Sequence, residues 1–257
     1  MKVVLLAGGK GTRITEESEY RPKPLIEIGG MPILWHIMKY FYYYGFNDFI
    51  VCAGYKQEMI KKWFSEYFFH TSDVLFDFTN GKDIQVKHSN TEKWKVAVVD
   101  TGIDTMTGGR IKKIQEYIEE ETFMMTYGDG VCDVNLSDLL SFHKDHGKIA
   151  TLTSVVLKQD KGLLDVGWDN TVKAFREKSS IETRLINAGY MVLNRKIFDY
   201  LEDDTTIFER QPMEKLASMG ELMSYQHNGF WQCMDTLRDK EYLENLWRKG
   251  ETPWKVW

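Results

Sequence analysis

The chain opens with KVVLLAGGKGTR, residues 2–13, in which a short apolar run leads into a glycine-rich segment. The apolar run predicts a buried strand at about residues 2–7. Three of the next four positions are glycine, and glycines can adopt positive φ values and bring several backbone N–H groups close to an anion. Lys10 and Arg13 add positive charge, as does Lys23 in the segment Pro22-Lys23-Pro24. This combination predicts an α/β fold with a site for the triphosphate of a nucleotide.

Spacing excludes two other phosphate-binding motifs. The dinucleotide-binding fingerprint requires a glycine three positions after its second glycine, and counting from Gly9 and Gly11 this position holds Ile14. A Walker A loop requires glycine and lysine followed by serine or threonine, which the chain does not contain. A plain glycine turn with nothing bound is the remaining alternative. The Thr12-Arg13 pair and the Pro-Lys-Pro segment beyond it favour phosphate binding.

Composition limits the class of partner. The 257 residues fit one α/β domain spanning residues 1–257. A net charge of -5 argues against a nucleic-acid partner, which normally requires a basic surplus. The three cysteines form no Cys-x-x-Cys motif, which indicates a reducing compartment. No stretch approaches the length of a membrane span and the N-terminal apolar run is too short for a signal peptide, so we expect a cytoplasmic protein without a membrane partner.

Hydrophobic periodicity predicts strands that alternate with helices. The predicted strands lie at about residues 2–7, 48–52, 95–99 and 123–127, with a hairpin of 74–78 and 84–87 around an Asn80-Gly81 turn. The predicted helices lie at about residues 33–44, 56–69, 135–146, 212–218 and 236–248. Residues 149–193, with turns at 160–162 and 169–170, predict a second sheet portion that covers the cleft. We therefore expect a Rossmann-like, mostly parallel twisted sheet with helices on both faces and a smaller β-rich portion.

Two aspartates are candidate metal ligands. Asp129 lies between two glycines after the strand at 123–127, where the ligands of open α/β sheets gather. Asp235 lies in an apolar setting just before the last predicted helix. Mg²⁺ prefers oxygen ligands and usually takes one or two protein carboxylates together with substrate phosphates. An ordinary turn for Asp129 and a helix N-cap for Asp235 are the alternatives.

Other polar residues are weaker candidates. Arg110 follows a Thr-Gly-Gly turn at the start of a predicted helix and could meet a phosphate or a base carbonyl, or could simply face solvent. Polar residues in apolar stretches could bind a hydroxylated ligand, or could be exposed at strand ends: Glu177, Lys178, and Asn187 before Gly189. His143 and His146 have no metal-binding spacing and are expected on a solvated helix face. The aromatic residues, among them Trp247, Trp254 and Trp257, are expected in the core or in a subunit contact.

As a set, these motifs resemble those of the sugar-phosphate nucleotidylyltransferases. The signature of that family, Leu-Ala-Gly-Gly-x-Gly-Thr-Arg followed by Pro-Lys-Pro, is similar to residues 6–13 and 22–24. Segments 33–38, 100–102, 106–110, 126–130 and 230–240 resemble its cytidylyl-transferring branch in particular. The resemblance spans nearly the whole chain.

The resemblance implies a nucleotide-diphospho-sugar transferase fold, with a nucleotide-binding half at about residues 1–133 and a sugar-phosphate-binding half at about 134–257. It implies transfer of CMP from CTP to a sugar 1-phosphate, with α-D-glucose 1-phosphate as the expected acceptor. It also implies Mg²⁺ as a cofactor and a homo-oligomer. The alternatives are another phosphorylated acceptor, UTP as the donor, or a sensor of nucleotide sugars without catalysis.

The resemblance also implies roles for individual residues. The residues expected at the nucleotide are Leu6, Ala7, Gly8, Gly9, Lys10, Gly11, Thr12, Arg13, Thr105 and Arg110. The residues expected at the sugar phosphate are Lys23, Glu177, Lys178, Asn187 and Gly189. Asp129 and Asp235 would hold Mg²⁺, and these two with Arg13 and Lys23 would be catalytic. The chain departs from the family's usual sequence at residues 162–164, Ser179 and Ala188, all in the sugar half.

Overall fold

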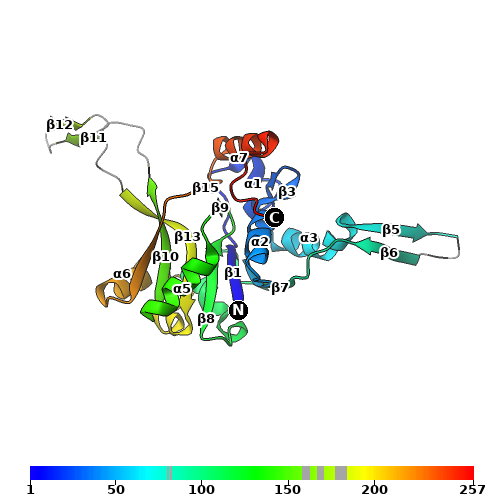
Figure 1. Cartoon of the computed structure of the whole chain (residues 1–257), viewed down its shortest axis with the longest axis horizontal. Helices are drawn as coiled ribbons and strands as arrows, with labels where there is room; N and C mark the ends of the chain where they lie inside the picture. The colour runs from blue at the N-terminus through cyan, green and yellow to red at the C-terminus, as the bar shows by residue number, and fades with distance from the viewer. Residues whose placement is uncertain (80, 82, 158–162, 167–170, 177–183) are drawn as a thin grey trace.

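A seven-stranded sheet forms the centre of the molecule (Figure 1). The computed structural model describes residues 1–79, 81, 83–157, 163–166, 171–176 and 184–257. The order of the central strands is β14-β10-β13-β8-β1-β4-β7. Their bounds, in chain order, are β1 (Lys2–Ala7), β4 (Asp48–Ala53), β7 (Lys95–Asp100), β8 (Thr122–Tyr127), β10 (Ala150–Leu157), β13 (Arg184–Asn194) and β14 (Leu222–His227).

The central sheet is mostly parallel, as the sequence predicts. β8, β1, β4 and β7 run parallel to one another, and β14 runs parallel to β10. β13 is antiparallel to both of its neighbours, β10 and β8. In chain order, β4 and β7 follow β1 on one side of it, and β8 then lies on the other side of β1. This reversal leaves a crevice at the carboxyl ends of β1 and β8, which is where open α/β sheets bind their ligands.

Helices cover both faces of the sheet, because alternate residues of its strands belong to two apolar cores. In β1, Val3 and Leu5 belong to one core, whereas Val4 and Leu6 belong to the other. Helices α2, α3, α5 and α7 contribute to the first core, and α4 and α6 to the second. Their bounds are α2 (Ile33–Tyr43), α3 (Gln57–His70), α4 (Thr107–Lys113), α5 (Leu136–His146), α6 (Gln211–Ser218) and α7 (Leu237–Lys249). None of the helices within the described ranges has the length and apolar character needed to cross a membrane.

Short elements complete the fold. They are α1 (Thr15–Ser18), η1 (Lys23–Leu25), η2 (Gln115–Tyr117), η3 (Arg195–Tyr200) and the paired strands β2 (Glu27–Ile28) with β3 (Met31–Pro32), β5 (Ser72–Asp77) with β6 (Asp83–Ser89), β9 (Gly130–Cys132) with β15 (Trp231–Cys233), and β11 (Leu163–Val166) with β12 (Val172–Arg176). Much of the predicted second sheet portion instead extends the central sheet, because β13 pairs with the edge of β8 and β10 pairs with β13. Of that portion, β11 and β12 form a separate ribbon. The turns predicted at 160–162 and 169–170 lie outside the described residues.

The ends of α5 confirm the predicted caps. The Oδ1 atom of Asn135 accepts hydrogen bonds from the backbone N–H groups of Ser137 and Asp138, at 3.0 and 3.2 Å. Gly147 ends the helix in the left-handed conformation, with φ at 64°. Both ends are set by residue types whose preference is local, so the sequence alone located this helix.

The expectation that His143 and His146 lie on a solvated face is wrong. His143 is buried, and its Nδ1 atom lies 2.8 Å from Oγ1 of Thr151 on β10. The Nε2 atom of His146 lies 2.7 Å from the same oxygen. Burial, together with the neighbouring His146, lowers the pKa of His143 to about 4. The spacing of the two histidines along α5 could not reveal which face of this helix packs against β10.

Four aromatic residues anchor the C-terminal segment in the core, as expected for their packing role. The His36 ring on α2 is fully buried, and the rings of Trp247, Trp254 and Trp257 lie 5.0, 6.3 and 6.3 Å from it, centroid to centroid. The His36 Nε2–H group donates to the Ile28 carbonyl at 2.7 Å, and Trp254 Nε1–H donates to His36 Nδ1 at 3.4 Å. Both ring nitrogens therefore have a partner only when the imidazole is neutral.

The neutral His36 ring makes the stability of the protein depend on pH. Burial lowers the pKa of His36 from 6.5 to about 4. As pH falls through 6.5, His36 takes up a proton in the unfolded chain, whereas in the folded chain it stays neutral until pH nears 4. The contribution of the neutral ring to the free energy of unfolding is therefore complete above this window and is lost on acidification within it. We expect the free energy of unfolding of wild type, relative to His36→Gln, to fall by up to about 1.4 kcal/mol per pH unit in the window. Urea unfolding at several pH values measures this. An equal pH dependence of the unfolding free energy in wild type and His36→Gln would contradict the prediction. His88→Gln is the control, because His88 lies on the exposed strand β6, and this variant should keep the pH dependence of wild type.

Candidate functional site

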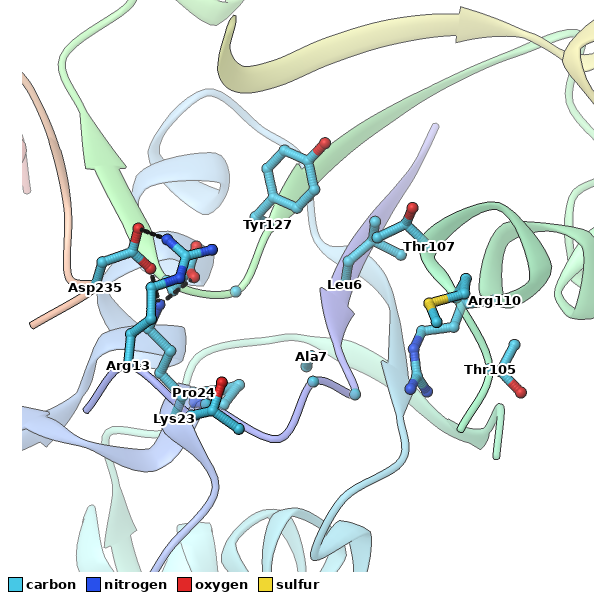
Figure 2. Close-up of a pocket in the computed structure, with 17 residues that line it drawn as sticks. Leu6, Ala7, Arg13, Lys23, Pro24, Thr105, Thr107, Arg110, Tyr127 and Asp235 are labelled. Carbon is cyan, nitrogen blue, oxygen red and sulfur yellow. Dashed lines mark hydrogen bonds and ion pairs between the residues drawn. The ribbon is translucent and has the colours of Figure 1, made fainter. Parts of the chain in front are cut away.

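A cavity of about 360 Å³ opens at the carboxyl ends of β1 and β8 (Figure 2). Its walls come from the glycine-rich loop after β1, from η1, from the start of α4 and from the turn after β8. The lining residues are Leu6, Ala7, Gly8, Gly9, Gly11, Thr12, Arg13, Lys23, Pro24, Thr105, Met106, Thr107, Arg110, Tyr127, Gly128, Asp129 and Asp235. All residues expected at the nucleotide line this cavity except Lys10.

Of the three loop glycines, Gly11 alone uses the positive φ that glycine allows. Gly11 has φ at 65°, a conformation that other residues rarely adopt. Gly8 is required for a different reason, since a Cβ atom built there would lie 2.1 Å from Nη1 of Arg110. Gly9 has neither a positive φ nor a neighbour within 4 Å of such an atom. The loop is therefore shaped by one unusual backbone angle and by one close approach of a side chain.

Lys10 does not line the cavity. Its Nζ atom lies 2.7 Å from Oδ1 of Asp104, and both side chains are exposed. This ion pair satisfies the charge of Lys10 at the surface. The positive charge facing the cavity comes instead from Arg13, Lys23 and Arg110.

Arg110 is buried beneath the glycine-rich loop, so its alternative as a solvent-facing residue is wrong. Its Nη1 atom donates to Oγ1 of Thr101 and to the carbonyl of Gly102, each at 2.7 Å. Burial lowers the pKa of the guanidinium from its ordinary value. These hydrogen bonds hold the guanidinium against the segment that follows β7, where it packs beside Gly8 and gives the wall of the cavity a positive charge. Thr105 is buried nearby, where its hydroxyl accepts from Lys113 Nζ at 3.2 Å.

The fold brings the two candidate metal ligands, Asp129 and Asp235, to one place. Asp129 directly precedes β9, and Asp235 follows β15, and these short strands pair antiparallel with Gly130 opposite Cys233. The backbone N–H of Met234 then donates to the carbonyl of Asp129 at 2.8 Å. This pairing sets the two aspartates side by side although they lie far apart in the sequence.

The N-cap alternative for Asp235 is wrong. Thr236 is the N-cap of α7, and it forms a capping box with Asp239. The Thr236 hydroxyl accepts from the N–H of Asp239, and the Asp239 carboxylate accepts from the N–H of Thr236. The helix is therefore capped without Asp235, whose carboxylate is free to face Lys23.

Lys23 bridges the two aspartates. Its Nζ atom lies 2.6 Å from Oδ2 of Asp129 and 2.6 Å from Oδ1 of Asp235. The Nη1 atom of Arg13 lies 2.5 Å from the other oxygen of Asp235, as the dashed lines in Figure 2 show. The Lys23 side chain is only 11% exposed, whereas that of Arg13 is 73% exposed. Two carboxylates thus face two cations in the lining of the cavity.

The surroundings of Lys23 and Asp235 favour the charged form of each. Burial lowers the pKa of the Lys23 ammonium, but the attraction of Asp129 and the hydrogen bonds to both aspartates outweigh burial and raise that pKa above its ordinary value. Burial raises the pKa of the Asp235 carboxyl, but Lys23 and Arg13 outweigh it and hold this pKa below its ordinary value. At neutral pH Lys23 is therefore an ammonium and Asp235 a carboxylate.

A second cavity, of about 280 Å³, adjoins the first and shares four of its residues: Arg13, Tyr127, Asp129 and Asp235. Its remaining walls are Thr126, Gly130, Asn187, Ala188, Trp231 and Cys233. Of the residues expected at the sugar phosphate, Asn187 lines this cavity and Lys23 lines the first. Glu177 and Lys178 lie outside the described residues, as does Ser179.

Gly189 lies behind the wall of the second cavity. Its φ is 89°, and a Cβ atom built there would lie 2.5 Å from Cδ2 of Tyr127. Gly189 therefore allows the Tyr127 ring to lie between the two cavities. The carbonyl of Ala188 accepts a hydrogen bond from Nε1 of Trp231 at 2.7 Å, so the departure at Ala188 is part of the wall.

The donor set at the junction of the cavities fits a divalent cation. The candidate ligand atoms of Asp129, Cys233 and Asp235 all lie within 4.8 Å of one another. The carboxylate oxygens are the ligands that Mg²⁺ prefers. A second group within the described residues, Cys132 with Asp133 and His227, has a structural explanation, because Asp133 Oδ1 accepts from His227 Nε2 and from the backbone of Phe230 at 2.8 and 2.7 Å.

Several residues of the first cavity, chiefly Tyr127 and Thr107, were not predicted from the sequence. The Tyr127 hydroxyl donates to Oε1 of Glu209 at 2.5 Å, and the Thr107 hydroxyl donates to Oε2 of the same side chain at 2.6 Å. Glu209 therefore links the start of α4 to the end of β8, two segments that line the cavity. The position of Tyr127 at the carboxyl end of a predicted strand could have found it, whereas no pattern marks Glu209.

Comparison with known proteins adds independent findings. Residues 2–238 match the protein family described as Nucleotidyl transferase. The chain is 50% identical over 258 residues to a glucose-1-phosphate cytidylyltransferase of Salmonella typhimurium, with 100% of both chains covered. It is 45% identical over 258 residues to a probable glucose-1-phosphate cytidylyltransferase of Bacillus subtilis, again with 100% of both chains covered.

A solved structure shares the fold. A putative glucose-1-phosphate thymidylyltransferase from Bacillus anthracis, in complex with a sucrose, gives a TM-score of 0.69 at 14% identity. The match covers 96% of this chain and 95% of that chain. At this identity, the likeness supports the architecture alone.

Proposed function

Since the chain belongs to the nucleotidyl transferase family, as its motifs suggested, we propose that it transfers CMP from CTP to α-D-glucose 1-phosphate, giving CDP-glucose and pyrophosphate. The observation that carries this proposal is the pair of carboxylates, Asp129 and Asp235, facing Lys23 and Arg13 where two cavities meet. The cavity of the glycine-rich loop suits the triphosphate, and the cavity lined by Asn187 and Trp231 suits the sugar phosphate.

The chemistry requires charge neutralisation and alignment. An oxygen of the sugar phosphate attacks the α-phosphorus of CTP, and the bond from that phosphorus to the departing pyrophosphate breaks, with the electron pair leaving on pyrophosphate. The attacking phosphate is largely ionised at neutral pH, since its second pKa is about 6, so no general base is needed. Arg13 and Lys23 neutralise the crowded negative charge and hold the two anions in line.

Asp129 and Asp235 would hold Mg²⁺ at the junction of the cavities, where the ion would supply further neutralisation of the phosphate charge. The buried Arg110 and the backbone of the glycine-rich loop would hold the nucleotide. A role as a sensor without catalysis is disfavoured by the retention of both carboxylates. Three unpaired cysteines support a cytoplasmic location for this reaction.

Pyrophosphate release, measured with CTP, UTP, ATP and GTP against a panel of sugar 1-phosphates, tests the proposal. We expect CTP with α-D-glucose 1-phosphate to give the highest kcat/KM. Faster turnover with UTP would overturn the choice of base, and faster turnover with another sugar would overturn the choice of acceptor. Tight binding of CDP-glucose without any pyrophosphate release would favour the sensor instead.

We also propose that the enzyme is a homo-oligomer that assembles through the β5–β6 ribbon. This ribbon projects from the body of the molecule beyond α3 (Figure 1). Its strands pair Phe76 with Ile84 and Val74 with Val86, so these four side chains share one face, and most of them are exposed. A two-stranded ribbon with an exposed apolar face is marginal by itself in water, which supports a second copy of the chain as its partner.

Substitution of the apolar face tests this assembly. We expect wild type to sediment as an oligomer at micromolar concentration and Phe76→Ser/Ile84→Ser to sediment as a smaller species. Leu75→Ser is the matched control, because Leu75 is exposed on the opposite face of the same strand. A monomeric wild type would contradict the proposal, as would equal dissociation by the control.

A further inference from the structure

A single ammonium group holds the two candidate metal-binding carboxylates together. Nζ of Lys23 lies 2.6 Å from an oxygen of Asp129 and 2.6 Å from an oxygen of Asp235 (Figure 2). Arg13 takes the remaining oxygen of Asp235. The Lys23 side chain is nearly buried, so water screens these pairs poorly. The ammonium thus makes the contacts that a cation between the two carboxylates would make.

A metal ion and this ammonium cannot share the carboxylates at low cost, because like charges a few ångströms apart repel strongly in a partly buried site. We propose that Lys23 occupies the cation position between Asp129 and Asp235 until a triphosphate binds, so that the metal enters with the nucleotide rather than before it. This inference rests on the proposed function, because it takes the two carboxylates to be the metal ligands for CMP transfer.

When a triphosphate binds, the Lys23 ammonium can move from the carboxylates to the phosphate oxygens. Lys23 lines the cavity of the glycine-rich loop, where a bound triphosphate presents anionic oxygens to the ammonium. Pro22 and Pro24 restrain the backbone on either side of it, so the movement falls to the flexible four-carbon stem. Arg13 is mostly exposed, and its release from Asp235 therefore costs little.

The position of Lys23 between the two carboxylates also explains the charge balance of the site. Two carboxylates held close together would repel each other if nothing lay between them. Lys23 and Arg13 offset both negative charges, so the site is electrically balanced before nucleotide arrives. A triphosphate brings its own negative charge and thereby makes room for a divalent cation in addition to the two basic side chains.

Binding of Mn²⁺ alone tests the inference without any turnover. Electron paramagnetic resonance of free Mn²⁺ gives the affinity of the protein in the absence of nucleotide. We expect wild type to bind Mn²⁺ weakly and Lys23→Met to bind it at least about tenfold more tightly, because a positive charge next to the carboxylates is gone. Lys23→Met/Asp129→Asn should lose this gain. Lys95→Met is the matched control, since it removes a lysine that pairs with an aspartate, Asp48, outside both cavities, and its Mn²⁺ affinity should equal that of wild type.

The outcomes separate this inference from the proposed function. Equal and tight Mn²⁺ binding by wild type and Lys23→Met, lost in Asp129→Asn, would overturn the role of Lys23 and leave the metal site standing. No Mn²⁺ binding by either protein would also overturn the role of Lys23, whereas CMP transfer is tested independently by the release of pyrophosphate. Thermal unfolding confirms that each variant is folded, and Lys23→Gln, which keeps a polar group, replaces Lys23→Met if the latter fails to fold.

Discussion

Asp129→Asn is expected to lower kcat for pyrophosphate release roughly a hundredfold or more, the scale on which removal of one preorganised electrostatic contact acts. The amide keeps the shape of the side chain but removes the negative charge that Lys23 and a metal ion require. Asp235→Asn should have a similar effect. Both rates are measured at saturating CTP and α-D-glucose 1-phosphate, so that weaker binding does not disguise a change in the chemical step.

The double variant sharpens this prediction. If the two carboxylates hold the same ion, Asp129→Asn/Asp235→Asn should be little slower than either single variant, because the first substitution already removes the ion. Multiplicative losses would indicate two independent roles. Asp48→Asn is the control, since Asp48 also pairs with a lysine, Lys95, but lies at the amino end of β4, whereas the cavity lies at the carboxyl ends of the neighbouring strands. Turnover like that of wild type in Asp129→Asn would refute the metal assignment.

Lys23→Met is expected to lower kcat by a similar factor, roughly a hundredfold, because an ammonium that neutralises the reacting phosphates is lost from a nearly buried site. The substitution also leaves two carboxylates close together with only Arg13 to offset them. We therefore expect Lys23→Met to unfold at a lower temperature than wild type, and Mg²⁺ to raise its unfolding temperature more than that of wild type.

Two measurements check the role of Lys23. An unchanged rate at saturating substrate would remove this lysine from the chemistry, whatever the thermal result. Lys95→Met, which breaks a surface ion pair with Asp48, should leave kcat unaltered. A slow Lys23→Met protein that does not respond to Mg²⁺ would indicate that the ammonium acts on the phosphates and has no part in balancing the carboxylates.

Much of the fold follows from local sequence. The apolar run of β1, the cap residue Asn135 and the terminating Gly147 each act on their immediate neighbours, so their elements appear where the sequence predicts them. The cavity residues of the glycine-rich loop were predictable for the same reason. The direction of individual side chains was less accessible, because Lys10 turns to Asp104 and His143 turns to Thr151, partners that are remote or on another element.

The sequence by itself determined that a strand ends in a cationic glycine loop and that an aspartate follows another strand of the same sheet. These features depend on residue types within a few positions of each other. Only the tertiary structure decided that Asp235 meets Asp129 at Lys23. That meeting requires β15 to pair with β9 in one register and Thr236 to cap α7 in place of Asp235. The packing of the whole sheet selects which distant segments pair. Backbone hydrogen bonds cannot select them, because the backbone groups are the same in almost every residue.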